Sequence, residues 1–188
     1  MAYAVVFYFN KNSEIPIYKI WNQLEEINLS PNKYKGGIRP HMTLAIFDSM
    51  GCDDCELELK HFVVESKMFS VQANHLGVFP NQNSVIFIAP SPSMELLAFQ
   101  ERIHQILKDK AVGPWEMYLP GKWIPHCTLA QQIEKKDMSA ALNTCIQIKL
   151  PMELNISQIG VVEFEPIKPL FEMDFSQIKP EDLENIVK

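Results

Sequence analysis

Pro40-His41-Met42-Thr43-Leu44-Ala45 and Pro125-His126-Cys127-Thr128-Leu129-Ala130 are two copies of one six-residue pattern that differ only at the third position. A segment repeated within a chain indicates a duplicated structural unit. In an extended strand, residues two apart project from the same face. Each copy therefore predicts a strand that presents its histidine and its threonine side by side, on the face opposite the intervening residue.

The repeat extends beyond these motifs. Each motif is followed by a predicted helix and then by a strand that carries Gly-Val, at Gly77-Val78 and at Gly160-Val161. These glycines lie 36 residues after His41 and 34 residues after His126. We expect residues 1–188 to form a single bilobal domain, with pseudo-repeats at about 30–90 and 115–175. A pseudo-twofold relation would let the two histidines face each other across a cleft.

Apolar periodicity predicts the other elements. Strands are expected at 2–9, 41–47, 69–73, 84–89, 126–130, 154–164 and 168–175. Helices are expected at 16–27, 53–66, 93–110 and 137–146, with Pro16 in a first turn and with Met94 and Leu97 facing inward. Residues 80–83 are predicted to form a turn and 113–125 an irregular loop.

Composition limits the possible functions. The chain has 188 residues, 47% of them hydrophobic, and a formal net charge of −6. Such a charge argues against coating long duplex nucleic acid but leaves room for a small nucleotide or an RNA end. The opening apolar run ends at Asn10 and lacks a basic leader, so it fits neither a secretory signal nor a membrane span. We therefore expect a cytoplasmic monomer without a membrane partner.

The four cysteines predict no disulfide framework. Cys52-x-x-Cys55 has no second such pair in the chain, which favours a structural role over a zinc site.

Two histidine and threonine pairs suit phosphodiester chemistry. The pKa of a free imidazole is about 6.5, so one histidine can accept a proton while the other donates one near neutral pH. The threonine hydroxyls can hydrogen-bond the non-bridging phosphate oxygens as charge develops there. This set of side chains needs no metal and no other cofactor.

At these residues the chain resembles the two-histidine (2H) phosphoesterase superfamily, which includes 2′-5′ RNA ligase-like proteins and cyclic nucleotide phosphodiesterases. Its hallmark is a pair of His-x-Thr-x motifs. The resemblance implies a bilobal α+β fold, with two antiparallel sheets flanking a central cleft and helices outside. It also implies cleavage of a 2′,3′-cyclic or 2′,5′-type phosphodiester, with His41 and His126 as catalysts and Thr43 and Thr128 as phosphate ligands.

One position departs from the family pattern. Gln131 stands where many bacterial and archaeal RNA ligase-like members carry arginine shortly after the second motif. Arg39, Lys35 or Lys122 are the candidates to meet the phosphate charge instead. Tyr118 and Trp123, in the loop before the second motif with Trp115, either stack on a base or pack the loop.

Several alternatives stay open at this point. The chain could be a binding module that holds a nucleotide or RNA end without cutting it, or a metal protein that uses both histidines with other ligands. The motifs do not say which histidine is the acid and which the base. They also do not separate hydrolysis from ligation.

Overall fold

The computed structural model describes residues 1–29, 38–80, 84–164 and 167–177. Eight strands and four α-helices make up this part of the chain. In chain order they are β1 (Ala2–Phe9), α1 (Lys11–Glu26), β2 (His41–Met50), α2 (Cys52–Glu65), β3 (Phe69–Phe79), β4 (Ser84–Pro90), α3 (Met94–Leu107), β5 (Ala111–Pro114), a 3₁₀ turn η2 (Glu116–Tyr118), β6 (Cys127–Ile133), α4 (Met138–Cys145), β7 (Met152–Phe164) and β8 (Lys168–Asp174). Among the described residues, no helix is long and apolar enough to cross a membrane.

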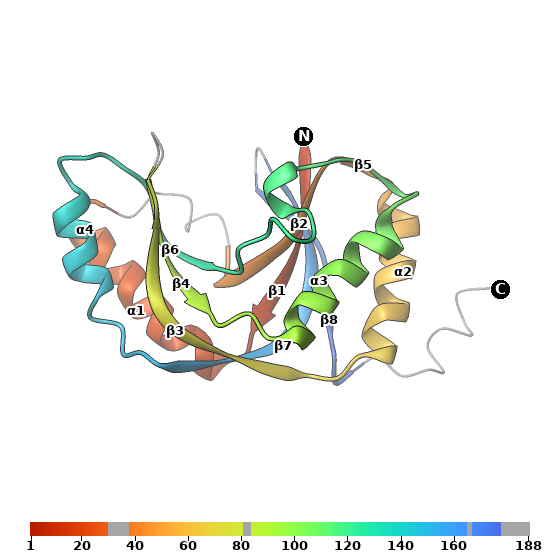
Figure 1. The fold of residues 1–188 in the computed structure, drawn as a ribbon, viewed down its shortest axis with the longest axis horizontal. Coiled ribbons are helices and arrows are strands. Elements are labelled where there is room, and N and C mark those ends of the chain that lie inside the picture. Colours follow the sequence, from red (N-terminus) through yellow and green to blue (C-terminus); the bar gives the residue numbers. More distant parts are fainter. Residues whose placement is uncertain (30–37, 81–83, 165–166, 178–188) are drawn as a thin grey trace.

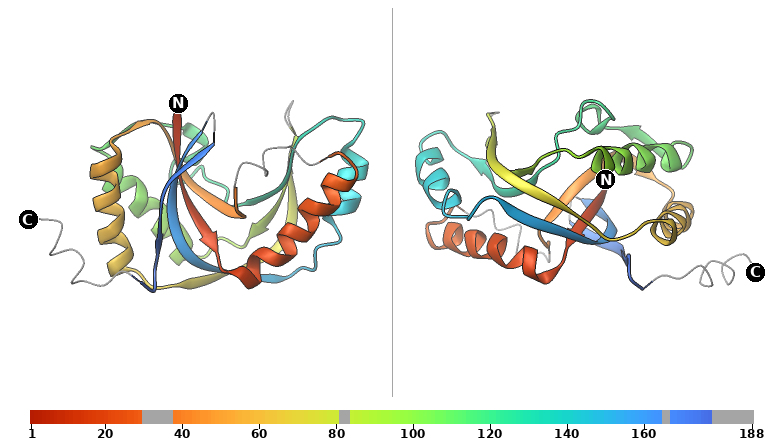
Figure 2. Two further views of the ribbon diagram at one scale, coloured as in Figure 1. Left: turned by 180° about the vertical axis from the view of Figure 1, so that it is seen from behind. Right: turned by 60° about the horizontal axis from the view of Figure 1, so that its bottom comes forward.

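All eight strands belong to one antiparallel sheet in the order β5-β2-β1-β7-β3-β4-β6, with β8 also pairing with β7. The predicted α+β class is confirmed, and the two expected sheets are continuous because Phe69–Ala73 of β3 pairs with Met152–Ile156 of β7. Helices α1 and α4 cover the outside of one half, and α2 and α3 cover the outside of the other (Figure 1). Seen from behind, the sheet curves into a U (Figure 2), and residues of β2 and β6 come into contact across it.

Strand β1 has two buried faces, which explains its continuous apolar run. Val5, Phe7 and Phe9 lie in the main hydrophobic core. Val6 and Tyr8 point the other way, into a smaller cluster that also contains Ala4 and Ile46. This second face becomes important below because it borders the cavity of the candidate site.

Helix α1 begins five residues before the predicted start at Pro16, so that expectation was wrong. The helix begins at Lys11 because the Asn10 side chain caps it, accepting a hydrogen bond from the Ser13 amide at 3.0 Å. Pro16 lies inside the helix. The apolar residues of its buried face are Ile17, Ile20, Trp21 and Leu24.

Two further expectations need correction. Met94 and Leu97 of α3 are exposed rather than inward-facing, because the buried face of this helix is formed by Leu96, Gln100, Ile103 and Leu107. The predicted loop 113–125 contains the end of β5 and the η2 turn, since Val112 and Pro114 pair with Ser49 and Phe47 of β2. The predicted turn at 80–83 falls largely outside the described residues.

Candidate active site

The two motif segments line a single cavity of about 600 Å³. His41 and Thr43 come from β2, Thr128 comes from β6, and His126 directly precedes β6. The other residues that line the cavity are Ala4, Val6, Tyr8, Trp21, Ile38, Ile46, Tyr118, Gln131, Val162, Phe164, Ile167 and Pro169. The structure therefore brings together the four side chains that the sequence pattern predicts, from positions more than 80 residues apart.

Both motif strands contain a bulge that follows the threonine. In β2 the register with β1 shifts between Val5 and Val6, and Leu44 and Ala45 are both buried. In β6 the register with β4 shifts as well, and the corresponding Leu129 and Ala130 are also buried. Because a bulge puts two successive residues against one partner, it breaks the strict alternation of faces. As a result, the residue five positions after each histidine lines the cavity: Ile46 in β2 and Gln131 in β6.

The two imidazoles are held by the same kind of contact. Nδ1 of His41 lies 2.7 Å from the carbonyl oxygen of Arg39, and Nδ1 of His126 lies 2.7 Å from that of Ile124. A carbonyl oxygen only accepts hydrogen bonds, so Nδ1 carries the proton in each ring. In the neutral ring, Nε2 is then the basic nitrogen, free to take a proton from a bound molecule.

Burial lowers the pKa of both imidazoles. The hydrogen bond to the main chain opposes this effect at each ring, and for His41 the nearby His126 lowers the pKa further. Both histidines therefore favour the neutral form. An anionic phosphate would favour the charged form and thereby restore a proton donor.

Aromatic rings pack against each imidazole. The rings of Phe79 and Phe87 lie 5.1 and 5.2 Å from that of His126, centroid to centroid, and the Tyr8 ring lies 6.3 Å from that of His41. Gly77 makes room for Phe87, since a Cβ at this glycine would lie 2.3 Å from the phenyl ring. In the same way, a Cβ at Gly160 would lie 2.8 Å from the ring of Tyr8.

Arg39 does not itself line the cavity, and its guanidinium is held by side chains of other elements. Its guanidinium donates to Glu14 at 2.9 Å, to Gln158 at 2.7 Å and to Glu172 at 2.9 Å. It also lies over the Tyr8 ring, 4.7 Å from the centroid. These contacts anchor the residue whose carbonyl orients His41, and they do not support the predicted direct contact with substrate phosphate.

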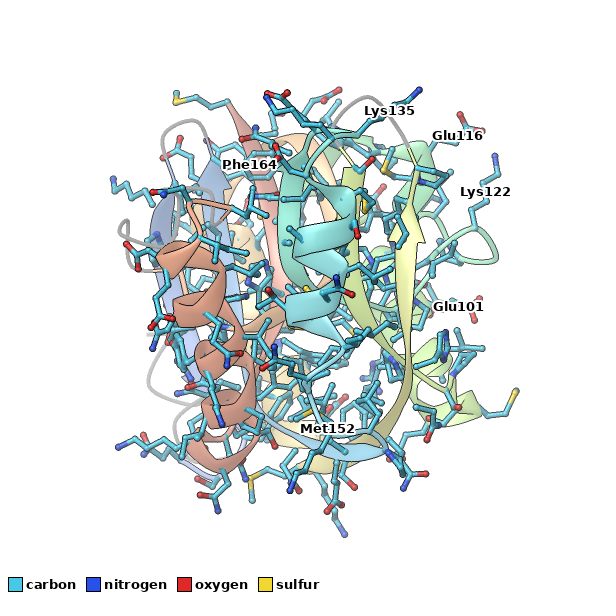
Figure 3. All side chains as sticks on the ribbon, turned by 90° about the vertical axis from the view of Figure 1, so that its left-hand side faces the viewer. Glu101, Glu116, Lys122, Lys135, Met152 and Phe164 are labelled. Atoms are coloured by element: carbon cyan, nitrogen blue, oxygen red, sulfur yellow. The ribbon has the colours of Figure 1, made fainter. Side chains whose placement is uncertain are left out.

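The other predicted substrate contacts differ in their placement. Tyr118 lines the cavity, and burial raises the pKa of its phenol. Lys122 forms an ion pair with Glu116 on the exposed surface, where both side chains point away from the body of the protein (Figure 3). Trp123 is buried and donates its indole hydrogen to the carbonyl oxygen of Thr43 at 2.9 Å. Lys35 lies outside the described residues.

The main chain of Tyr118 is fixed by helix α3. The Gln100 side-chain amide donates to the Tyr118 carbonyl at 2.6 Å, and Nε2 of His104 lies 2.8 Å from the same oxygen. His104, to which the sequence assigned no role, therefore helps to place a cavity residue.

Sequence reasoning missed a large part of the lining. Tyr8, Trp21, Val162 and Phe164 belong to β1, α1 and β7, and no motif marks them. The Phe164 ring also meets the Trp115 ring edge-on, at 5.8 Å between centroids. The sequence did contain one signal, because the opening strand is apolar on both faces. However, a strand that is buried on both sides and contacts no ligand has the same pattern.

No group of three or more metal-ligating side chains occurs among the residues that the structure describes. Lining residues with a permanent charge are also absent from that part of the chain. The polar groups that face the cavity are the imidazoles, hydroxyls, phenols, one indole and the Gln131 amide.

Comparisons with solved structures identify the fold. The chain is similar to a protein solved as a phosphoesterase, with 14% identity, a TM-score of 0.56 and coverage of 93% of this chain and 98% of the other. It is also similar to Escherichia coli LigT solved with 3′-AMP, with 13% identity, a TM-score of 0.55 and coverage of 93% and 98%. No curated protein sequence matches significantly.

The match to a family model is more direct. The model that describes the 2′-5′ RNA ligase superfamily matches residues 16–166, which include both motif segments and every strand from β2 to β7. Because this match extends over most of the chain, the protein belongs to the 2′-5′ RNA ligase superfamily.

Proposed function

We propose that this protein is a metal-independent phosphodiesterase that opens 2′,3′-cyclic phosphates or cleaves 2′,5′-linked nucleotides at RNA ends. The observation that carries the proposal is the meeting of both histidine and threonine pairs in one cavity, each imidazole with Nδ1 bound to a carbonyl oxygen. Membership of the superfamily supports a phosphoesterase.

The geometry supports general acid and base catalysis for the hydrolysis of a cyclic phosphate. A neutral imidazole removes a proton from water through Nε2 as the water oxygen attacks phosphorus. The bond from phosphorus to one ribose oxygen breaks, and the other imidazole, protonated, gives its Nε2 proton to that oxygen. Thr43 and Thr128 hydrogen-bond the non-bridging oxygens. The products are a phosphomonoester and a free ribose hydroxyl, and the two histidines have exchanged protonation states.

The cavity also fits the size and character of a nucleotide. Its volume of about 600 Å³ lies in the range typical of small-molecule sites. Apolar side chains, among them Val162 and Phe164, line it beside the polar groups, so that a base can be buried next to the phosphate. The solved complex of LigT with 3′-AMP supports a nucleotide as the ligand class.

The proposal is tested with 2′,3′-cyclic nucleotides and a short RNA that ends in a 2′,3′-cyclic phosphate, in the presence of chelator. We expect His41→Ala and His126→Ala each to lower kcat by about 100-fold or more, the usual contribution of a proton-transfer group. His75→Ala, at an exposed position on β3, is the matched control and should leave turnover unchanged. Full activity in either cavity variant would refute the assignment.

The alternative is a binding module for nucleotides or RNA ends. Both histidine and threonine pairs are intact and share one cavity, which favours catalysis. If the folded protein binds a 2′,3′-cyclic nucleotide and returns it unchanged, this alternative replaces the proposal.

A further inference from the structure

The two motif strands meet across the cavity at open edges of the sheet. Strand β5 pairs with β2 only from Phe47 onward, so among the described strands only β1 pairs with the part of β2 that carries His41 and Thr43. Strand β6 is the last strand of the sheet and pairs with β4. Main-chain groups on these edges need hydrogen-bond partners from elsewhere.

Each threonine carbonyl on these edges accepts a hydrogen bond from a tryptophan indole. Trp123 donates to the Thr43 oxygen at 2.9 Å, and Trp21 donates to the Thr128 oxygen at 3.3 Å. Both tryptophans are buried. Each comes from a part of the chain remote from the threonine it holds, since Trp21 lies on α1 and Trp123 lies three residues before His126.

Trp123 connects the two motifs directly. It lies shortly before the histidine of the second motif, and its indole bonds to a main-chain oxygen of the first. A second contact runs parallel to it: the thiol of Cys127 is hydrogen-bonded by the main chain of His41, which partly offsets the rise of its pKa caused by burial. The residues on both sides of His126 thus hold the main chain of β2 at His41 and at Thr43. Together they fix where one histidine and threonine pair lies relative to the other.

We propose that Trp123 is a positioning residue that sets the spacing between the two catalytic pairs through its hydrogen bond to the Thr43 carbonyl. This inference rests on the proposed function for its catalytic consequence. It replaces the idea that Trp123 stacks on a base, because its ring is buried and does not line the cavity.

The test uses Trp123→Phe, which keeps an aromatic ring in the core and removes the donor. The loss of one hydrogen bond that aligns two reacting groups should lower kcat about tenfold, with KM nearly unchanged. Ser66→Ala is the control, because the Ser66 hydroxyl donates to the Phe62 carbonyl oxygen at 2.6 Å at the end of α2, outside the cavity lining. This control should keep both kcat and KM.

A second measurement does not require turnover. In NMR spectra of the imidazoles, Trp123→Phe should shift the signals of both His41 and His126, whereas Ser66→Ala should shift neither. Unshifted signals, or a rise in KM with kcat unchanged, would overturn the positioning role. If the wild-type protein turns over no phosphodiester but both signals still shift, the positioning role stands and the proposed function fails.

Discussion

At the residue scale, the site depends on Gly77 and Gly160, because a side chain at either position would displace an aromatic ring that packs on an imidazole. Phe87 is confined by three neighbours: it lies beside Phe79 at 4.3 Å between centroids, beside His126 and over Gly77. The repeated Gly-Val of the sequence therefore has a physical meaning. Gly77 clears space for the ring at His126, and Gly160 clears space for Tyr8, the ring at His41.

We expect Gly77→Ala to push the Phe87 ring toward His126, which would destabilise the fold by about 1–3 kcal/mol, as overpacking usually does. It should also lower kcat. Adding Phe87→Leu should recover the stability, because the smaller side chain removes the clash, but not kcat, because His126 then keeps only one of its two aromatic neighbours, Phe79. Chemical denaturation and turnover assays of both variants separate these two effects.

Gly51→Ala serves as the control for this experiment. The nearest atom to a Cβ at Gly51 is 3.7 Å away, an ordinary contact, and the residue lies outside the cavity lining. The variant should retain wild-type turnover. A Gly77→Ala protein that is as stable and active as wild type would contradict the proposed role of this glycine.

At the scale of the elements, the bulges decide which residues reach the cavity. A regular strand would have turned the residue four positions after each histidine toward the ligand, but Ala45 and Ala130 are buried and Ile46 and Gln131 line the cavity instead. The two halves therefore differ at one equivalent position, an aliphatic side chain in β2 and an amide in β6. Gln131 is a site at which the charge of the cavity can be changed without touching the histidines.

We expect Gln131→Arg to strengthen binding of the phosphomonoester product about tenfold. A phosphomonoester carries a charge of about −1.5 to −2 at neutral pH, and an arginine here would face it as a permanent cation among the described lining residues. The measurement is the inhibition constant of a 2′- or 3′-nucleoside monophosphate. Gln131→Met, uncharged and similar in length, is the control, and equal inhibition of both variants would show that position 131 does not face the phosphate.

The sequence predicted the two motif strands, their partner helices and the four central side chains because these depend on local periodicity and on the repeat. It did not predict the bulges, since a register shift depends on the neighbouring strand. Trp123 shows the same limit. Its place in a loop before the motif left base stacking and loop packing open, but the buried indole bonds to Thr43, and that partner lies 80 residues away.

At the scale of the whole molecule, the cavity exists because one continuous sheet folds back on itself. Tyr8, His41 and Val162 reach the cavity from one half of the sheet and His126 and Thr128 reach it from the other. Neither half encloses the site alone. The partial burial of both imidazoles is therefore a consequence of global folding, and it links their protonation to the stability of the whole protein.

The sign of this linkage follows from the direction of the pKa shifts. Burial lowers the pKa of His41 and His126 in the folded protein, whereas in the unfolded chain each titrates near 6.5. Above pH 6.5 both states hold these rings neutral, and the full stability is present. As the pH falls below 6.5, the unfolded chain binds protons first, so the free energy of unfolding decreases until the folded-state pKa values are reached.

We therefore expect the wild-type protein to lose stability between pH 7.5 and pH 5.5, and a His41→Asn/His126→Asn variant to lose less over the same interval. Chemical denaturation at the two pH values measures both differences. His75→Asn, at an exposed position, should show the same loss as wild type. An equal loss in the double variant would mean that the two rings are not desolvated by folding, which would also remove the reason for their neutral form in the folded protein.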